Sequence, residues 1–403
     1  MPRPVVPCAA MGPLDGFRVI ELATMVSAPI ATMLLADQGA EVIKVEAPPH
    51  GDIMRRLGPQ RGGVTAGFAT INRGKRSLAL DLKEERGIRL LLDLVRTADV
   101  FVQNFRPGVI DRLGLGVDRL RKINDRLVYV SISGFGHEGP YAQKRVYDPI
   151  IQALSGFADI QADRVTGEPK MVRTIIPDKV TGLTAAQAIT AALLARERTG
   201  EGQHIELAML DATISFIWPE GFVRQILVGG EVAHGRPGST SDLIYRTADG
   251  YITASTISDA EWEGMARATG HLEWLEDERY KTAAGRISNA DQRLDMVGDV
   301  LRTRTSAEWI EALEAEDVPC AKILSRNEVL TDPQVIRNEL LRELDHPQVG
   351  RMRVPRPAAR FSGTPPEPVP PSPVLGEAAD DVLGGLGISS EEIDELRRQK
   401  IVG

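Results

Sequence analysis

Asp178 is the residue of this chain whose type and position are best suited to chemistry. It opens the segment IPDKVTGLTAAQAITAALLARERTGEGQ, residues 176–203, in which small and aliphatic residues predominate from Val180 to Leu194. These residues continue round the whole helical cylinder, so we expect a long helix that is buried on most sides. A carboxylate near a helix N-terminus is expected to stay ionised, and covalent catalysis by Asp requires an ionised carboxylate.

A second interpretation of Asp178 is structural, because Asp is among the preferred N-cap residues of helices. The two interpretations are compatible, and the local sequence does not choose between them. The end of the helix is clearer. Gly200 should end it, and Arg196 and Arg198 occupy the last turn, where a cation interacts favourably with the helix dipole.

The bulk composition is that of an ordinary globular protein. The chain has 403 residues, 42% hydrophobic and 26% charged, a length that favours two domains or one large elaborated domain. A net charge of −8 provides no basic field for nucleic acid or an anionic membrane, and no apolar run suits a membrane span. The only cysteines, Cys8 and Cys320, exclude a disulfide framework and fit a cytoplasmic protein. Six scattered histidines predict no metal site.

The first half of the chain alternates strand and helix patterns. This order predicts an α/β fold with a mainly parallel sheet covered on both faces, and ligands gathered beyond the carboxyl ends of the strands. The polar or Gly-rich segments TMVSAP, EAPPHGD, NFRPG and SGFGHEGPY each follow a strand, so the site is expected there. The expected strands are Phe17–Ala23, Glu41–Pro48, Ser77–Leu82, Asp99–Phe105 and Leu127–Gly136, and the helices among them include Ala28–Ala40 and Glu84–Thr97.

The texture of the sequence changes in its second half. A hairpin is expected around the Asp249-Gly250 turn, and short helices over 261–269, 291–302 and 306–316 indicate a smaller α+β domain. A Pro-rich strap then leads to a last helix, 389–400, with a Ser-x-x-Glu start. We therefore predict a disordered leader over 1–13, a large domain from 14–205, a linker over 206–242, a small α+β domain over 243–335 and a return segment, 336–403, that completes the large domain.

Nine segments, spread over residues 14 to 401, resemble one family in their joint order and spacing. The chain resembles the class III CoA-transferases, the CaiB/BaiF type, a group that includes formyl-CoA transferase, carnitine CoA-transferase and alpha-methylacyl-CoA racemase. The segments are GFRVIELATMVSAPIATMLLADQGAEVIKVEAPPHGD, INRGKRSLALDLK, NFRPGVIDRLGLG, VSISGFGHEGPY, YDPIIQALSG, PDKVTGLTAAQAITAALLARERTGEGQHIELAMLDA, YRTADGYI, VPCAKI and FSGTPP.

The resemblance implies both an architecture and a reaction. The architecture is an interlocked, ring-like homodimer with a Rossmann-like large domain that binds CoA and a smaller α+β domain. The reaction moves CoA from an acyl-CoA thioester to a free carboxylic acid through covalent aspartyl intermediates, with Asp178 as the nucleophile. Coenzyme A and acyl-CoA are then substrates, and no tightly bound cofactor, metal, nucleic acid or membrane is implied.

The resemblance also implies a set of CoA contacts. Arginine and lysine suit the phosphates, and the strand-end loops supply the rest. The family has a basic residue after the second strand, where this chain has Ala47 and Pro48; only His50 or Arg55 could substitute for it. The contacts carried over are Val26, Ser27, the backbone of Leu80, Asp81, Leu82 and Lys83, then Asn104, Phe105, Arg106, Arg112, Lys144, Arg145 and Tyr147.

Two other functions stay open from the sequence. An alpha-methylacyl-CoA racemase needs a second base besides Asp178, and in that branch a His stands where this chain has Tyr147. A tyrosine, with an ordinary pKa of about 10, is a poor proton shuttle at neutral pH, which favours the transferase. A non-catalytic CoA-binding protein would be favoured only if Asp178 were missing.

Two further features bear on the substrate and on redox chemistry. The segment HGRPGSTSD lacks the glycine run that closes over the site in formyl-CoA transferase, so the sequence does not define the acid that receives CoA. Cys320 has no neighbouring His base, and we expect it to be a structural thiol.

Overall fold

The computed structural model describes residues 12–163, 165–229 and 242–403. The predicted leader, apart from its last two residues, and most of HGRPGSTSD lie outside the described residues. The chain divides into two compact units. The large unit comprises Met1–Gly156, Met171–Phe216 and Glu339–Gly403, and the small unit comprises Phe157–Lys170 and Ile217–Asn338.

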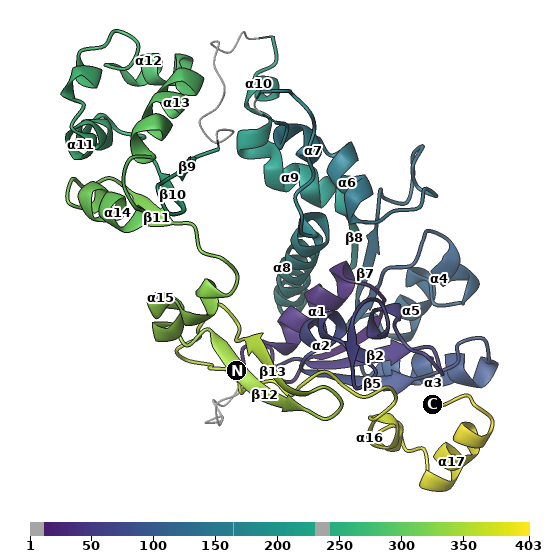
Figure 1. The fold of residues 1–403 in the computed structure, drawn as a ribbon. Helices are drawn as coiled ribbons and strands as arrows, with labels where there is room; N and C mark the ends of the chain where they lie inside the picture. The colour runs from purple at the N-terminus through teal and green to yellow at the C-terminus, as the bar shows by residue number, and fades with distance from the viewer. Residues whose placement is uncertain (1–11, 164, 230–241) are drawn as a thin grey trace. The chain divides into compact units, whose positions relative to one another are not determined.

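The large unit is built on a six-stranded sheet in the order β5-β2-β1-β6-β7-β8 (Figure 1), and each pair of neighbours in it is parallel. The α/β prediction with a mainly parallel sheet is therefore confirmed for this unit. The strands are β1 (Arg18–Leu22), β2 (Glu41–Glu46), β5 (Lys75–Ala79), β6 (Val100–Gln103), β7 (Val128–Ser133) and β8 (His204–Ala208).

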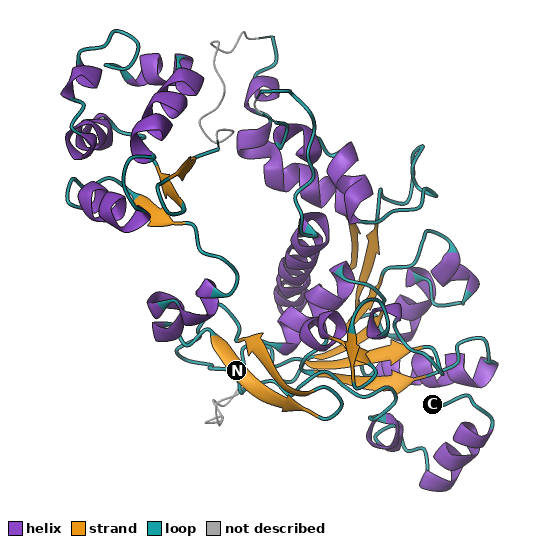
Figure 2. Cartoon of the chain, in the orientation of Figure 1, coloured by secondary structure: helices purple, strands orange, loops and turns teal. Residues whose placement is uncertain are grey.

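Helices cover both faces of this sheet (Figure 2), and the buried residues of β1, β2, β6 and β7 are divided between two cores, one on each face. Val100 and Val102 pack on one face, with α1 (Ser27–Ala36) and α8 (Ile176–Thr199). Phe101 packs on the other face, with α3 (Glu85–Arg96) and the C-terminal helices α16 (Ala379–Gly384) and α17 (Ser390–Arg398).

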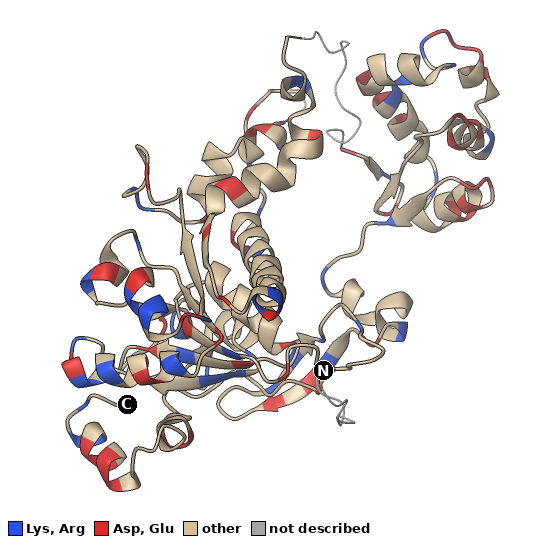
Figure 3. Cartoon of the chain, turned by 180° about the vertical axis from the view of Figure 1, so that it is seen from behind, with Lys and Arg blue, Asp and Glu red and all other residues tan. Residues whose placement is uncertain are grey.

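Helix α8 lies against α1 and against the sheet on one side only. The helix is nearly free of charge except near its ends (Figure 3), as expected. However, Leu183 and Leu194 are 58% and 55% exposed within this chain. The expectation of burial on most sides is wrong for the single chain, because the sheet, α1 and α6 leave part of the helix surface uncovered.

The remaining elements of the large unit connect these layers. The C-terminal segment folds back on the sheet: Gly403 N–H donates to the Ala79 carbonyl at 3.1 Å, and Ala378 N–H to the Ser77 carbonyl at 3.0 Å. The other elements are the 3-10 turn η1 (Ile53–Arg55), β3 (Gln60–Arg61), β4 (Val64–Thr65), α2 (Ala66–Ile71), α4 (Val109–Arg112), α5 (Val117–Ile123), α6 (Asp148–Leu154) and the hairpin β12 (Leu341–His346) with β13 (Gly350–Pro355).

The small unit has a three-stranded antiparallel sheet in the order β11-β10-β9 beside a core that contains Trp262 and Trp309. The hairpin around Asp249-Gly250 and the three short helices are present as expected. The elements are β9 (Ile244–Arg246), β10 (Tyr251–Ala254), β11 (Cys320–Lys322), α7 (Phe157–Ile160), α10 (Val223–Ile226), α11 (Asp259–Thr269), η3 (Leu272–Leu275), α12 (Ala283–Ser288), α13 (Ala290–Leu301), α14 (Ser306–Glu314), η4 (Glu328–Thr331) and α15 (Pro333–Arg337).

The boundaries of the two units differ from the predicted domains: Phe157–Lys170, predicted within the large domain, belongs to the small unit, and the predicted linker is divided between the units after Phe216. Part of the predicted linker is regular structure, since β8 is the edge strand of the large sheet and α9 (Met209–Gly221) follows it. The pairing of His204–Ala208 with β7 explains this difference, because strand pairing that is distant in sequence cannot be read from local pattern.

Candidate active site

Asp178 lies in the first turn of α8 and does not cap it. The N-cap position belongs to Ile175, and no side chain caps the helix. Pro177, in the first turn, is suited to a helix start because its missing N–H has no partner to lose there. The N-cap interpretation of Asp178 is therefore wrong, and its carboxylate is available for other contacts.

Three residues of the large unit, Asp148, Gln152 and Ser27, define the surroundings of Asp178. The Asp178 N–H donates to Oδ2 of Asp148, the first residue of α6, at 3.2 Å, and Gln152 Nε2 donates to Oδ1 of Asp148 at 2.7 Å. Asp148 and Gln152 are both buried. On the other side lies Ser27, the first residue of α1, and hydrogen bonding from its side chain and backbone lowers the pKa of the Asp178 carboxyl.

The pKa of Asp178 reflects these neighbours. Burial and then the negative charge of Asp148 raise it to about 6, although hydrogen bonding from Ser27 lowers it. A raised pKa differs from the expectation that the helix N-terminus would keep the Asp178 carboxylate fully ionised. Burial and a second acid outweigh the helix dipole, and the carboxylate form still predominates at neutral pH.

A close approach of α1 and α8 brings Ser27 to Asp178. A Cβ atom placed on Gly182, one turn beyond Asp178, would lie 2.7 Å from Cγ2 of Ile30 and 2.9 Å from the Ser27 carbonyl oxygen. Only glycine fits this contact without displacing one of the helices. The glycine therefore sets the separation of the two helix starts that form the site.

The predicted CoA contacts on the loops after β1 and β6 lie near this pair. Val26 is the N-cap residue of α1 and is buried. Asn104 bonds to the backbone of Thr24 through both its amide atoms, at 3.1 and 2.7 Å, and so holds the β1–α1 loop. Phe105 packs against the core beneath the sheet.

The predicted contacts after β5 are partly used within the chain. The N–H groups of Leu80, Asp81 and Lys83 bond to Glu46, Ile401 and the Asp81 side chain at 2.9 Å each. Leu80 is fully buried, and Leu82 packs partly against the same core. A cavity of about 640 Å³ adjoins this segment and is lined by Pro48, Pro49, Asp81, Leu375, Arg397, Lys400, Val402 and Gly403.

Four predicted phosphate-binding cations, Arg106, Arg112, Lys144 and Arg145, lie exposed on the loops and short helices of the large unit. Among the described residues none of the four forms an ion pair; Lys144 lies over the ring of Tyr141, 4.7 Å from its centroid. Tyr147 is 65% exposed. These cations are free to meet an anionic ligand.

Arg55 cannot replace the basic residue that is missing after β2. It is buried, it donates to both carboxylate oxygens of Glu46 at 2.8 and 2.7 Å, and its guanidinium stacks 3.9 Å from the centroid of Phe68. The Arg55 alternative is wrong because the guanidinium is already neutralised in the core. His50 is exposed.

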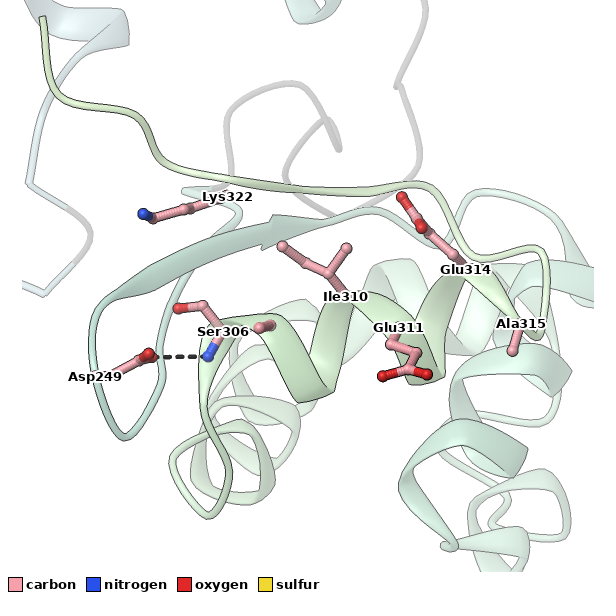
Figure 4. Close-up of a pocket in the computed structure, with 8 residues that line it drawn as sticks. Asp249, Ser306, Ile310, Glu311, Glu314, Ala315 and Lys322 are labelled. Atoms are coloured by element: carbon pink, nitrogen blue, oxygen red, sulfur yellow. Dashed lines mark hydrogen bonds between the residues drawn. The ribbon is translucent and has the colours of Figure 1, made fainter. Parts of the chain in front are cut away.

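A second cavity, of about 740 Å³, lies in the small unit and contains none of the predicted site residues (Figure 4). Two of its polar groups have structural partners: Asp249 Oδ1 accepts from the Ser306 N–H at 2.7 Å, and Lys322 pairs with Glu328 at 2.8 Å. Nearby, Cys320 is partly buried, and burial raises the pKa of its thiol.

Sequence reasoning missed Asp148 as the partner of Asp178. An Asp-Pro pair that begins a helix is a local signal of a helix start, but only the fold brings α6 against α8.

Within the described residues, no group of three or more His, Cys, Asp or Glu side chains could hold a metal ion. No helix in the described ranges is long and apolar enough to cross a membrane.

Comparison with known proteins defines the class. The family model for CoA-transferase family III matches residues 14–379. Succinyl-CoA:glutarate CoA-transferase of Mus musculus is 32% identical over 94% of this chain and 88% of its own length. Formyl-CoA:oxalate CoA-transferase of Streptomyces coelicolor is 33% identical over 96% and 99%. Succinate–glutarate CoA-transferase of Agrobacterium fabrum is 34% identical over 93% and 96%.

Solved structures agree with the sequence comparison. Rv3272 of Mycobacterium tuberculosis has a TM-score of 0.81 at 31% identity, covering 92% of this chain and 99% of its own. A CAIB/BAIF family protein of Brucella suis has a TM-score of 0.80 at 32% identity, covering 93% and 100%. The chain belongs to CoA-transferase family III, and it is an enzyme of the CoA-transferase class.

Proposed function

We propose that this enzyme transfers CoA from an acyl-CoA thioester to a free carboxylic acid, with Asp178 as the nucleophile. The observation that carries the proposal is the Asp178 carboxylate in the first turn of α8, uncapped, beside Ser27 and with a pKa of about 6. Such a group is mostly ionised at neutral pH, and it is less stabilised in that state than an ordinary solvated carboxylate. Both properties suit a nucleophile.

The reaction divides one acyl exchange into four steps. The Asp178 carboxylate attacks the donor thioester carbonyl and expels the CoA thiolate. The product of this step is an acyl–aspartyl anhydride. The thiolate then attacks the Asp178 carbonyl of the anhydride and releases the donor acid, leaving an aspartyl–CoA thioester. The acceptor carboxylate attacks this thioester and again expels thiolate. Attack of the thiolate on the acceptor carbonyl forms the new acyl-CoA and regenerates the Asp178 carboxylate.

The Ser27 N–H and hydroxyl are placed to stabilise this chemistry. They hydrogen-bond to the carboxylate in the resting enzyme, and they can donate to the oxyanion that develops on the same carboxyl carbon during thiolate attack. The negative charge of Asp148 contributes to the raised pKa of Asp178, and a less stabilised carboxylate is a more reactive nucleophile toward the thioester.

The proposed CoA site runs over the loops that follow β1, β5, β6 and β7. The four unpaired cations, Arg106, Arg112, Lys144 and Arg145, would bind the phosphates, and Val26, Ser27, Asn104, Phe105 and the backbone of Leu80–Lys83 would contact the remaining parts of CoA. Tyr147 borders this region. The cavity beside Asp81 provides space for one end of the ligand.

A dicarboxylic acid is the proposed acceptor. Two of the relatives described above are named for succinate or succinyl-CoA and glutarate, and they match nearly the whole chain. We therefore propose succinyl-CoA as a donor and a dicarboxylate such as glutarate as an acceptor. A panel of free acids offered with succinyl-CoA, with the products identified by mass spectrometry, tests this choice.

We also propose that two copies of the chain form the working enzyme, interlocked as the resemblance implies. The supporting observation is an exposed apolar set on α8 and α9: Leu183, Leu194 and Phe216 are 58%, 55% and 56% exposed. Light scattering coupled to gel filtration should give a dimer mass. A monomer at micromolar concentration with full activity would contradict this part of the proposal.

The racemase alternative can be separated directly. With succinyl-CoA and glutarate the enzyme should exchange CoA, and with a 2-methylacyl-CoA in deuterated water it should not exchange the alpha proton. Asp178→Asn and Asp178→Ala should abolish CoA transfer while leaving folding intact. Rapid deuterium uptake with no CoA exchange across the acid panel would contradict the transferase function.

A further inference from the structure

The loop between β1 and α1, residues 23–27, has a backbone that needs external support. Met25 has a φ of +69°, in the left-handed region that a residue with a Cβ rarely adopts. Val26 follows with φ −125° and ψ −56°, and its side chain makes no cap hydrogen bond. This loop nevertheless ends at Ser27, the residue that contacts the Asp178 carboxylate.

Three side chains hold three consecutive residues of this loop: they come from β2, from the N-cap of η1 and from the residue that follows β6. Lys44 Nζ donates to the Ala23 carbonyl at 2.9 Å. Asn104 accepts from the Thr24 N–H at 3.1 Å and donates to the Thr24 carbonyl at 2.7 Å.

The third support acts on the strained residue itself. Asp52 Oδ1 accepts from the Met25 N–H at 3.2 Å. The left-handed residue is therefore fixed from one side by Asp52, and the residue before it is fixed on both its N–H and its carbonyl by Asn104.

A buried ion cluster fixes the supporting side chains in turn. The Lys44 ammonium, fully buried, lies 2.6 Å from Glu21 Oε1 and 2.9 Å from Asp52 Oδ2. Lys75 donates to the other oxygen of Glu21 at 2.7 Å. Burial alone would raise the pKa of Glu21, but Lys44 and Lys75 lower it to about 2, so the cluster is charged. A buried ion cluster adds little stability over apolar side chains, so stability alone does not account for it.

We propose that Lys44, Asp52 and Asn104 are positioning residues for the reaction: they hold Met25 in its left-handed conformation and thereby keep the Ser27 N–H and hydroxyl directed at Asp178. The inference rests on the proposed role of Asp178. Without the support, Met25 relaxes toward negative φ and Ser27 withdraws. The kcat then falls by a larger factor than the KM for acyl-CoA rises, because the four proposed phosphate-binding cations lie outside this loop.

The test compares Asp52→Ala and Asn104→Ala with a matched control. Asp37→Ala removes another buried carboxylate, which pairs with Arg73 at the opposite end of α1 and does not contact the loop. For each variant we would measure kcat, KM, the pH–rate profile and the midpoint of thermal unfolding. Because Ser27 lowers the pKa of Asp178, loss of its contact should move the acidic limb of the profile to higher pH.

The expected result is a fall in kcat of about tenfold or more in Asp52→Ala and Asn104→Ala, with the acidic limb raised by about half a unit or more. The KM should change less than about threefold in Asp52→Ala, whereas it should rise in Asn104→Ala because Asn104 is also a proposed CoA contact. Asp37→Ala should lower the unfolding midpoint and leave kcat and the acidic limb unchanged. If kcat and the limb are unchanged in both loop variants, or if Asp37→Ala changes them equally, the positioning role is wrong.

A rescue distinguishes conformation from general packing. Glycine adopts a φ near +70° without the steric penalty that methionine meets, so Met25→Gly in the Asn104→Ala or Asp52→Ala background should recover about threefold or more of the lost kcat. Absence of recovery in both backgrounds would also contradict the proposal. Failure of the proposed function itself is separate: it would be seen as activity that survives in Asp178→Asn with the loop intact.

Discussion

The backbone N–H of Asp178 donates a hydrogen bond to Oδ2 of Asp148 at 3.2 Å, which places two acids side by side where α6 and α8 begin. Gln152 fixes the second oxygen of Asp148, and Asp148 is 3% exposed. The start of α8 is therefore held by the Asp148 carboxylate, while the Asp178 carboxylate remains available for reaction. The charge of Asp148 also contributes to the raised pKa of Asp178.

This arrangement predicts the pH dependence of the enzyme. Activity requires ionised Asp178, so kcat should rise with pH through an apparent pKa of about 6. Asp148→Asn keeps an oxygen that can accept from the Asp178 N–H but removes the charge, so it should shift this limb to lower pH by about half to one unit. A pH–rate profile of both proteins measures the shift. A limb that stays in place or moves to higher pH would contradict the electrostatic role of Asp148.

The same pKa predicts that the ionised Asp178 carboxylate, which the reaction requires, lowers the free energy of unfolding. The Asp178 carboxyl binds its proton more tightly in the folded chain than in the unfolded chain, so protonation of this group stabilises the fold. This stabilisation is present at low pH and is lost as pH rises through about 6. At pH 8 Asp178→Asn should be more stable than the wild type by up to about 3 kcal/mol, and the difference should shrink near pH 4.5.

Urea unfolding at the two pH values tests this effect. The variant Asp178→Asn removes the ionised group without changing the size of the side chain. Equal stability of variant and wild type at pH 8 would mean that the carboxylate is not strained by its surroundings.

Much of the large unit could be predicted from the sequence, because its strands and helices have strong local signals. Val100, Phe101 and Val102 belong to a continuous apolar strand, and the observed alternation of these residues between two cores is the consequence of burial on both faces. The long helix and its C-terminal Gly200, which has a φ of +84°, were predicted by the same kind of local pattern.

The parts that could not be predicted depend on contacts between distant segments. Nothing in the sequence near Arg55 shows that Glu46 and Phe68 enclose its guanidinium. Similarly, the exposure of Leu183 follows from which face of α8 the sheet covers. The partnership of Asp148 with Asp178 has the same origin, since it depends on how α6 packs against α8.

Gly182 gives a prediction about the geometry of the site. In Gly182→Ala the added Cβ would contact Ile30 and the Ser27 carbonyl, so α1 and α8 must move apart. We expect a loss of about 1–3 kcal/mol in unfolding free energy and a fall in kcat of about tenfold, because Ser27 is displaced from Asp178.

A helical glycine elsewhere serves as the control. Gly298 in α13 has ordinary space, with its nearest neighbour atom, Cδ1 of Tyr245, 3.7 Å from an added Cβ. Gly298→Ala should therefore be neutral or stabilising and should keep full activity. If Gly182→Ala behaves like Gly298→Ala, the close approach is not required for catalysis.

The unpaired cations give a prediction about CoA binding. Each cation that contacts a CoA phosphate is replaced by alanine in turn. These variants should have a KM for acyl-CoA that is about fivefold higher and a kcat that is largely unchanged, because the same contact is made in the ground state and the transition state. The four variants are Arg106→Ala, Arg112→Ala, Lys144→Ala and Arg145→Ala.

Arg302→Ala is the matched control for these variants, since Arg302 is exposed and paired with Asp299 at 2.6 Å in α13. Its KM should equal that of the wild type. Should all four test variants also keep the wild-type KM, the phosphates must bind elsewhere.

The central claim is that Asp178 forms covalent intermediates, and chemical trapping tests it most directly. The enzyme is incubated with succinyl-CoA, treated with hydroxylamine and digested, and the peptides are examined by mass spectrometry. Attack of hydroxylamine on an aspartyl anhydride or thioester converts the side chain to a hydroxamate. The account predicts a hydroxamate at Asp178 that depends on succinyl-CoA and is absent in Asp178→Asn. Active enzyme with no modification at Asp178, or with the modification on another residue, would contradict it.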